Sequence, residues 1–119
     1  MIVDDEPSIR RVIALILESA GYRTKIAASG QAAIELLADA PEVALILLDI
    51  SMPGIPAVEL HRRLRSAAPR ARLLLFTGYA HEVVAMDETV LEKPATEARL
   101  LRTIREVLDR PEGSKRRSG

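Results

Sequence analysis

The sequence predicts an α/β protein built on a doubly wound, five-stranded parallel sheet. Short apolar runs of strand length alternate with amphipathic segments of helix length along most of the chain. This alternation is typical of right-handed βαβ units with helices on both faces of a sheet. In addition, polar residues follow the apolar runs. Polar residues at these positions are suited to binding, because ligands of such folds bind outside the carboxyl ends of the strands.

The first half of the chain predicts three strands and two helices. Residues 1–3 form the stub of a strand, residues 22–28 a more polar edge strand, and residues 43–48 a strand buried on both faces. Ser29 can cap a helix over residues 31–38. The first helix, over residues 7–21, repeats apolar residues at three- and four-residue steps on one inward face: Ile9, Val12, Ile13, Ile16, Leu17 and Ala20.

The second half predicts two further strands, over residues 72–78 and 89–92. A helix over residues 56–67 is expected to turn Val58, Leu60 and Leu64 inward and Arg62, Arg63 and Arg65 outward. Residues 81–86 have room for a turn or two of helix. Thr96 can cap a last helix whose apolar face carries Leu100, Leu101, Ile104, Val107 and Leu108. We therefore expect one domain over residues 1–109 and a disordered basic tail over residues 110–119.

Composition narrows the class of function. The 119-residue chain has no cysteine, which excludes disulfides and thiolate metal sites. Aromatic residues make up 3% of the chain, too few to predict a stacking surface for single-stranded nucleic acid. The net charge is zero, but residues 110–119 carry +3 and the rest −3, so the folded part predicts no nucleic-acid surface. No membrane span or secretory signal is evident, and a cytoplasmic location is expected.

Polar residues stand at four of the predicted strand ends. Asp4 and Asp5 follow the first strand, Asp49 follows the third, Thr77 ends the fourth and Lys93 follows the fifth. If the strand order is 2-1-3-4-5, the first and third strands are neighbours about 5 Å apart. The fifth strand then lies roughly 10 Å from the third, a gap that a lysine side chain can largely close. These side chains are therefore expected to converge on one small volume.

This set of groups predicts phosphoryl chemistry with magnesium. Two carboxylates about 4 Å apart near a protein surface repel by roughly 4 kcal/mol, so a cluster of three needs a cation or must take up a proton. An all-oxygen site with open positions suits Mg²⁺, which keeps several waters and favours phosphate as a further ligand. Lys93 and Thr77 add a positive charge and a hydroxyl donor suited to a phosphoryl group. The Asp49 carboxylate is a plausible nucleophile toward phosphorus.

Over residues 1–109 the chain resembles the receiver domain of bacterial response regulators. The matching stretches are "IVDDEPSIRR", "LILLDISMPG", "LLLFTGYA" and "VLEKP", which occur in the order typical of that family. The resemblance implies a flavodoxin-like fold with strand order 2-1-3-4-5. It also implies a cytoplasmic signalling protein and not an enzyme acting on a separate substrate.

The resemblance further implies roles for individual residues. Asp49 would accept a phosphoryl group from the phosphohistidine of a sensor histidine kinase or a histidine phosphotransfer protein. Asp5, Asp49 and the Ser51 backbone carbonyl would bind Mg²⁺, with Asp4 acting through water. Thr77 would donate a hydrogen bond to a phosphoryl oxygen, and the Lys93 ammonium would form an ion pair with the phosphoryl group. The peptide bond between Lys93 and Pro94 is expected to be cis, as is common in the family.

The chain departs from the family pattern near the fifth strand. Val90 stands where the family usually has an aromatic residue that reports phosphorylation, and Ala95 stands where phenylalanine is common. Pro56 and Ala57 replace the usual Asp-Gly pair. The interval between Thr77 and Lys93 is short, so the fourth helix is expected to be shortened or missing. Because the first strand begins almost at Met1, the sequence suggests a trimmed domain or a piece of a longer protein.

Simpler explanations exist for each residue taken alone. The two consecutive aspartates could form a solvated turn, Asp49 could cap a turn, and Lys93 could be an exposed loop residue. His61 and His81 are expected on the surface.

Three functions are compatible with the sequence: a phosphoacceptor, working as a single-domain regulator or as the receiver of a hybrid kinase; a degenerate receiver acting only as an interaction module; and a Mg²⁺-dependent phosphohydrolase. The third lacks an evident general acid, and there is no Walker or Rossmann glycine pattern.

Overall fold

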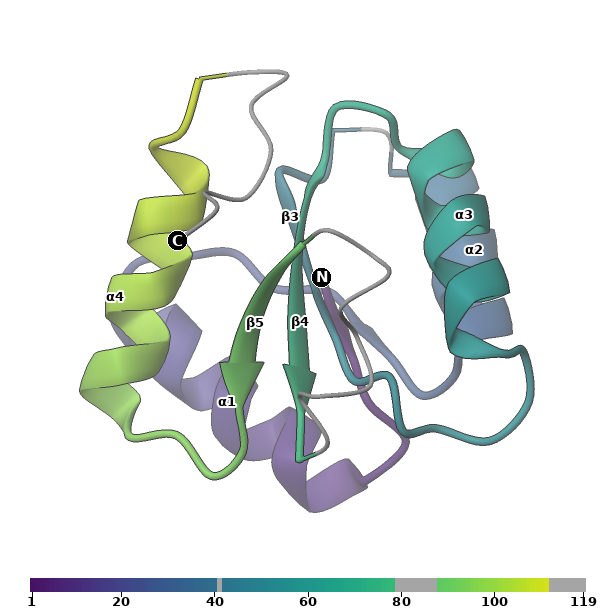
Figure 1. The fold of residues 1–119 in the computed structure, drawn as a ribbon. Coiled ribbons are helices and arrows are strands. Elements are labelled where there is room, and N and C mark those ends of the chain that lie inside the picture. Colours follow the sequence, from purple (N-terminus) through teal and green to yellow (C-terminus); the bar gives the residue numbers. More distant parts are fainter. Residues whose placement is uncertain (41, 79–87, 112–119) are drawn as a thin grey trace.

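A computed structural model of the chain describes residues 1–40, 42–78 and 88–111. Five parallel strands form one sheet in the order β2-β1-β3-β4-β5, which confirms the predicted fold class and strand order. Figure 1 shows helices on both faces of this sheet. The strands are β1 (Ile2–Val3), β2 (Ile26–Ala27), β3 (Leu45–Leu48), β4 (Arg72–Thr77) and β5 (Thr89–Glu92).

Four helices belong to the described part of the chain. They are α1 (Pro7–Ser19), α2 (Gly30–Ala38), α3 (Ala57–Ala67) and α4 (Glu97–Leu108), so the label α4 denotes the last helix of the domain. Three of them begin as the sequence predicts. Pro7 occupies the first turn of α1, where its missing N–H is not needed. The side chains of Ser29 and Thr96 accept hydrogen bonds of 3.1 Å from the backbone amides of Ala32 and Arg99.

The sheet separates two hydrophobic cores. On one face, α2 and α3 pack against β3 and β4 through Leu37, Leu60, Leu64, Ile46 and Leu75. On the other, α1 and α4 cover the sheet, with residues that include Leu17, Leu47, Leu74, Leu100 and Ile104 (Figure 1). Burial on both faces explains why β3 and β4 are continuous apolar runs instead of alternating ones. The two cores hold the strands rigidly and thereby fix where each strand ends.

Several details of the prediction were wrong. Val12 and Val58 are 54% and 62% exposed, although both were expected to face inward. Because successive helical residues are 100° apart, Val58 projects roughly opposite to Leu60 and cannot share its inward stripe. Arg65 and His61, expected on the surface, are half-buried. The second strand is also shorter than predicted, since only Ile26 and Ala27 pair with β1.

Two expectations concern parts of the chain outside the described residues. The helix expected over residues 81–86 lies there, together with His81. Most of the tail expected over residues 110–119 lies there as well. Among the helices that are described, none has both the length and the apolar character required to cross a membrane.

Candidate functional site

The polar residues singled out in the sequence lie along the carboxyl edge of the sheet. Asp4 follows β1 and Asp49 follows β3, and the two strands are direct neighbours. Thr77 is the last residue of β4, and Lys93 follows β5. Pairing of β1 with β3, β3 with β4 and β4 with β5 brings these strand ends together. The predicted convergence at one edge of the sheet is therefore present in the structure.

Asp49 is held by its own turn. Its side chain is buried, and its Oδ1 atom accepts hydrogen bonds from the Ser51 amide (2.9 Å) and the Ser51 hydroxyl (2.6 Å). The backbone amide of Asp49 donates to the carbonyl of Val3 at 3.0 Å, which ties the turn to β1. These bonds leave Oδ2 facing the Lys93 ammonium at 3.4 Å. One carboxylate oxygen is thus anchored, and the other lies toward the cation.

Asp4 is the most deeply buried carboxylate at this edge, with 1% of its surface exposed. Its Oδ1 accepts a hydrogen bond from the Glu6 amide at 2.9 Å, and its Oδ2 accepts one from Lys93 at 3.2 Å. Its carbonyl oxygen accepts a hydrogen bond from Arg10 at 2.7 Å. A buried charge requires such partners, because an unpaired carboxylate would lose its hydration without compensation. Asp4 therefore supports the loop that leads from β1 into α1.

The Lys93 ammonium lies between two carboxylates. Its Nζ is 3.2 Å from Asp4 Oδ2 and 3.4 Å from Asp49 Oδ2. It also lies 5.0 Å from the centre of the Phe76 ring, within the range of a cation–π contact. The Lys93 backbone amide donates to the Thr77 carbonyl at 2.8 Å, and the bond to Pro94 is cis, as expected. Backbone and side-chain contacts together direct this lysine toward the acidic residues.

Asp4, Asp5 and Asp49 form an acidic cluster that could hold a metal ion. One ligand atom from each residue lies within 4.8 Å of the others. Asp5 is exposed, whereas the other two carboxylates are buried. Two of these carboxylates face the Lys93 ammonium and the third lies close to them, so the cluster has an excess of negative charge that a divalent cation would neutralise. Carboxylate oxygens beside an open, exposed position fit a small, oxygen-seeking cation such as Mg²⁺.

Thr77 and Ser51 complete the set of residues predicted from the sequence. Thr77 is fully buried at the end of β4 and stands opposite Glu92 in the register of β4 and β5. Ser51 is exposed in the turn after β3, and its side chain bonds to Asp49. The sequence pointed to the Ser51 carbonyl but did not predict this hydroxyl contact. The roles of Arg10 and Phe76 at this edge were also missed, since an arginine in a helix and an apolar strand residue give no signal of their own.

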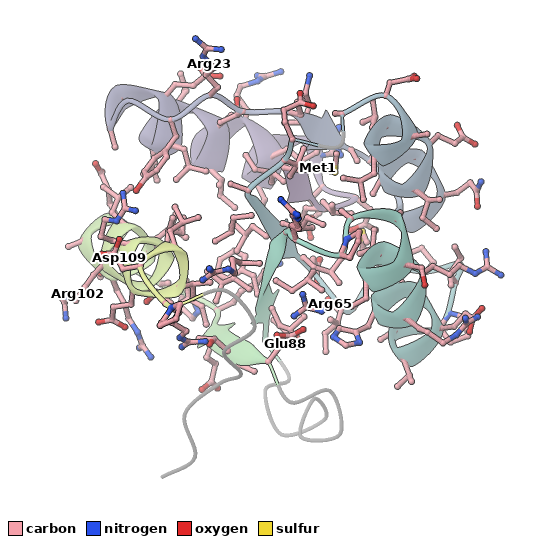
Figure 2. The ribbon with its side chains drawn as sticks, turned by 90° about the horizontal axis from the view of Figure 1, so that it is seen from above. Met1, Arg23, Arg65, Glu88, Arg102 and Asp109 are labelled. Carbon is pink, nitrogen blue, oxygen red and sulfur yellow. The ribbon has the colours of Figure 1, made fainter. Side chains whose placement is uncertain are left out.

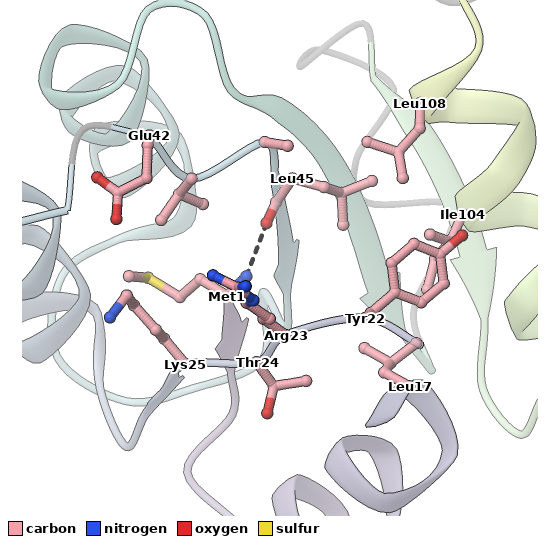
Figure 3. A pocket seen from close by; sticks show the side chains of 12 residues that line it. Met1, Leu17, Tyr22, Arg23, Thr24, Lys25, Glu42, Leu45, Ile104 and Leu108 are labelled. Carbon is pink, nitrogen blue, oxygen red and sulfur yellow. Dashed lines mark hydrogen bonds between the residues drawn. The ribbon is translucent and has the colours of Figure 1, made fainter. Parts of the chain in front are cut away.

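The opposite edge of the sheet carries a pocket of about 540 Å³. Its lining comes from the starts of β1 and β3 and from the ends of α1 and α4, and includes Tyr22, Leu45 and Ile104 (Figure 3). The Met1 amino group donates to the Leu45 carbonyl at 2.7 Å in this pocket. Burial, with a smaller contribution from Lys25, lowers the pKa of this amino group to about 6. None of the residues predicted for the acidic site lines it.

This fold and this site together define a receiver-type signalling domain. Residues 1–105 match the family of response regulator receiver domains, and the chain belongs to that family. It is 33% identical over 102 residues to the response regulator receiver protein CpdR of Brucella abortus (strain 2308), covering 79% of this chain and 82% of CpdR. It is 30% identical over 117 residues to the sensor kinase CckA of the same strain, covering 92% of this chain but only 12% of the kinase.

A solved structure with the same fold is the response regulator TrrA of Thermotoga maritima, described as a complex with Mg²⁺ and beryllofluoride. The TM-score is 0.77 at 27% sequence identity, and the match covers 89% of this chain and 95% of TrrA. The chain thus spans most of TrrA and of CpdR but a small fraction of CckA. The likeness extends across the sheet and the helices that position the acidic edge.

Proposed function

We propose that this domain accepts a phosphoryl group on Asp49 and works in a two-component phosphorelay. The observation that carries the proposal is the position of the Lys93 ammonium, 3.2 Å from Asp4 and 3.4 Å from Asp49 at the end of a different strand. A cation placed beside a nucleophilic carboxylate can neutralise the charge of an incoming phosphoryl group. Membership in the receiver family supports the same chemistry.

Mg²⁺ is the proposed cofactor. Asp5, Asp49 and the Ser51 carbonyl would hold the ion, and Asp4 would contribute through water. The close approach of the three carboxylates supports this assignment, as does the description of TrrA as a Mg²⁺ complex. When bound, the ion would supply charge neutralisation at the phosphoryl oxygens.

The chain's own residues account for the transfer step. Oδ2 of Asp49 attacks phosphorus while the bond from phosphorus to the donor breaks, and the donor keeps the electron pair. Lys93 pairs with a phosphoryl oxygen, and the Thr77 hydroxyl donates a hydrogen bond to another. Oδ1 stays bonded to Ser51, which keeps the carboxylate in one orientation. Positioning and charge neutralisation do most of the work, because the transition state is loose.

The proposed donor is the phosphohistidine of a sensor histidine kinase or of a histidine phosphotransfer protein. The domain would catalyse at most its own phosphorylation and dephosphorylation, in the cytoplasm, and contact neither nucleic acid nor membrane itself. It would comprise residues 1–109 and act as a single-domain regulator or as the receiver of a hybrid kinase. Similarity to CpdR favours the former, and similarity to CckA allows the latter.

A degenerate receiver that binds partners without phosphorylation is the second candidate. Val90 favours it, because this residue is partly buried against the core where the family usually has an aromatic reporter. In this alternative the fold is kept, and the acidic edge has no reaction to perform. The two functions differ in one measurable property, the ability of Asp49 to form an acyl phosphate.

Incubation with Mg²⁺ and a small acyl-phosphate donor, followed by intact-mass measurement, tests the proposal. We expect the mass to increase by one phosphoryl group, and the increase to disappear in Asp49→Asn. Asp39→Asn is a matched control, because Asp39 lies at the end of α2, away from the acidic edge. Absence of an adduct on the unmodified chain would favour the interaction module. Continuous phosphate release from unrelated phosphoesters would instead indicate a phosphohydrolase.

A further inference from the structure

A second charged cluster lies beside the start of β5. Glu88 directly precedes this strand, and its Oε2 atom lies 2.8 Å from His61 Nε2 and 3.0 Å from Arg65 Nε. Arg65 Nη2 also donates to the same oxygen. Figure 2 shows Arg65 of α3 and Glu88 turned toward one another. The carboxylate directly before β5 is therefore bound by two side chains from a helix more than twenty residues away in sequence.

Two of the three side chains in this cluster are largely shielded from solvent, whereas that of Arg65 is 38% exposed. The side chain of Glu88 is 10% exposed and that of His61 is 19% exposed. Arg65 Nη1 donates to the carbonyl of Ala71 at 2.9 Å, directly before β4. Hydrogen bonds to a guanidinium that uses several of its N–H groups at once hold both partners in a fixed geometry. The cluster thus joins α3 to the starts of both β4 and β5.

The strand next to this cluster lies at the edge of the sheet. In the part of the chain that is described, β5 has four residues and pairs with β4 alone. Glu88 stands before the strand and Lys93 stands after it, so the two residues mark its two ends. A strand rises by about 3.3 Å per residue, and all four residues of β5 pair with β4, so the backbone between Glu88 and Lys93 is extended and has little slack. A shift at its start is therefore transmitted to its end.

We propose that Glu88 is a positioning residue for Lys93, acting through β5 with Arg65 and His61 as its partners. The inference rests on the proposed function, because it is the phosphoryl transfer at Asp49 that needs Lys93 in place. Lys93 Nζ meets its two carboxylates at 3.2 and 3.4 Å, which leaves little tolerance for movement of the strand. A misplacement of about 1 Å can cost up to about a hundredfold in rate.

Glu88→Gln tests the proposal, because it keeps the size of the side chain and removes its charge. Glu92→Gln is the matched control: Glu92 belongs to the same strand, is exposed, and lies closer to Lys93 in sequence. We expect Glu88→Gln to slow phosphorylation of Asp49 by a small acyl phosphate about three- to tenfold and Glu92→Gln to change it less than about twofold. In a Lys93→Ala background, Glu88→Gln should not slow phosphorylation further, because the lysine that Glu88 is proposed to position is then absent.

A second measurement does not depend on phosphorylation. The amide of Lys93 donates a hydrogen bond to the Thr77 carbonyl. Hydrogen exchange at this amide should become at least about threefold faster in Glu88→Gln. The Leu47 amide in β3 is the control, and its exchange rate should not change. The proposal is overturned if both the phosphorylation rate and the Lys93 exchange rate equal those of the unmodified chain, or if Glu88→Gln slows phosphorylation equally with and without Lys93. If the unmodified chain forms no adduct, the proposed function fails, and the exchange measurement still decides the role of Glu88.

Discussion

The two ends of β5 carry charged clusters of opposite character. After the strand, Lys93 lies between the carboxylates of Asp4 and Asp49, with Asp5 nearby, and no other ion pair to these two carboxylates occurs among the described residues. Before the strand, Glu88 is a single carboxylate bound by Arg65 and His61. The acidic cluster has more negative than positive groups, whereas in the Glu88 cluster two basic side chains bind one oxygen of a single carboxylate. An excess of one sign calls for an external ion, and a satisfied cluster calls for none.

The charge balance of each cluster indicates its role: the acidic cluster is suited to binding a ligand, and the Glu88 cluster is suited to supporting the structure. A cluster with uncompensated charge costs folding free energy unless a ligand neutralises it, and proteins keep such clusters where they function. A satisfied cluster can instead fix the relative positions of two elements. The comparison predicts that the two ends of β5 respond differently to mutation and to divalent cations.

The largest effect on stability is expected for Lys93→Met. Removing the Lys93 ammonium leaves the buried carboxylates of Asp4 and Asp49 without this shared partner, and breaking a buried ion pair from one side typically costs about 3 kcal/mol or more. The free energy of unfolding, measured with urea in the absence of divalent cations, should fall by that amount. Mg²⁺ should recover a large part of the loss. Equal losses with and without Mg²⁺ would show that the acidic cluster does not hold the ion.

The amino group of Met1 predicts a pH effect that belongs to neither cluster. Its pKa is lowered from 8.0 to about 6 in the folded chain, so between these values the unfolded chain binds more protons. Stability is therefore greatest above pH 8 and falls by roughly 1–3 kcal/mol as the pH drops to 6. Urea unfolding at several pH values measures this, with the acetylated amino terminus as control. Acetylation should make the free energy of unfolding less dependent on pH between 6 and 8. An unchanged pH dependence would contradict the lowered pKa of the Met1 amino group.

A smaller effect is expected for Arg65→Met at the other end of β5. The variant removes the contacts of Arg65 with Glu88 and with the Ala71 carbonyl, which should lower the free energy of unfolding by about 1–2 kcal/mol. Addition of Mg²⁺ should not change that cost, which distinguishes this end of the strand from the Lys93 end. Arg62→Met, on the exposed face of α3, should have no measurable effect. A Mg²⁺-sensitive loss in Arg65→Met would break the distinction between the two clusters.

The sequence predicted one of these clusters and missed the other, for a physical reason. Asp4, Asp49 and Lys93 directly follow predicted strands, and parallel strands place their carboxyl ends at a common edge, so local sequence and topology suffice to bring them together. Glu88 has no such signal. Its partners lie on α3, and the helical period alone placed Arg65 outside. Only the packing of α3 against β4 and β5 turns Arg65 and His61 toward a carboxylate.

The same reasoning explains the errors within helices. Leu60 and Leu64 are one turn apart and share an inward face, as the period predicts. Val58 was grouped with them because it is apolar, although its angle on the helix places it on the other side. Apolar character without helical phase is therefore a poor guide to burial. The ends of β3 and β4 are predicted more reliably than the inward faces of the helices. Both strands are buried on both faces, so a continuous apolar run marks where each one ends.

The acidic edge is proposed to hold a phosphoryl group on Asp49 beside a magnesium ion. A crystal structure with Mg²⁺ and beryllofluoride, a stable mimic of the phosphoryl group, tests it most directly. We expect beryllofluoride bonded to Asp49, within hydrogen-bond distance of Lys93 and Thr77, with the ion bound by Asp5 and Asp49. Beryllofluoride bound elsewhere, or an acidic edge that holds neither group at saturating concentrations, would contradict it.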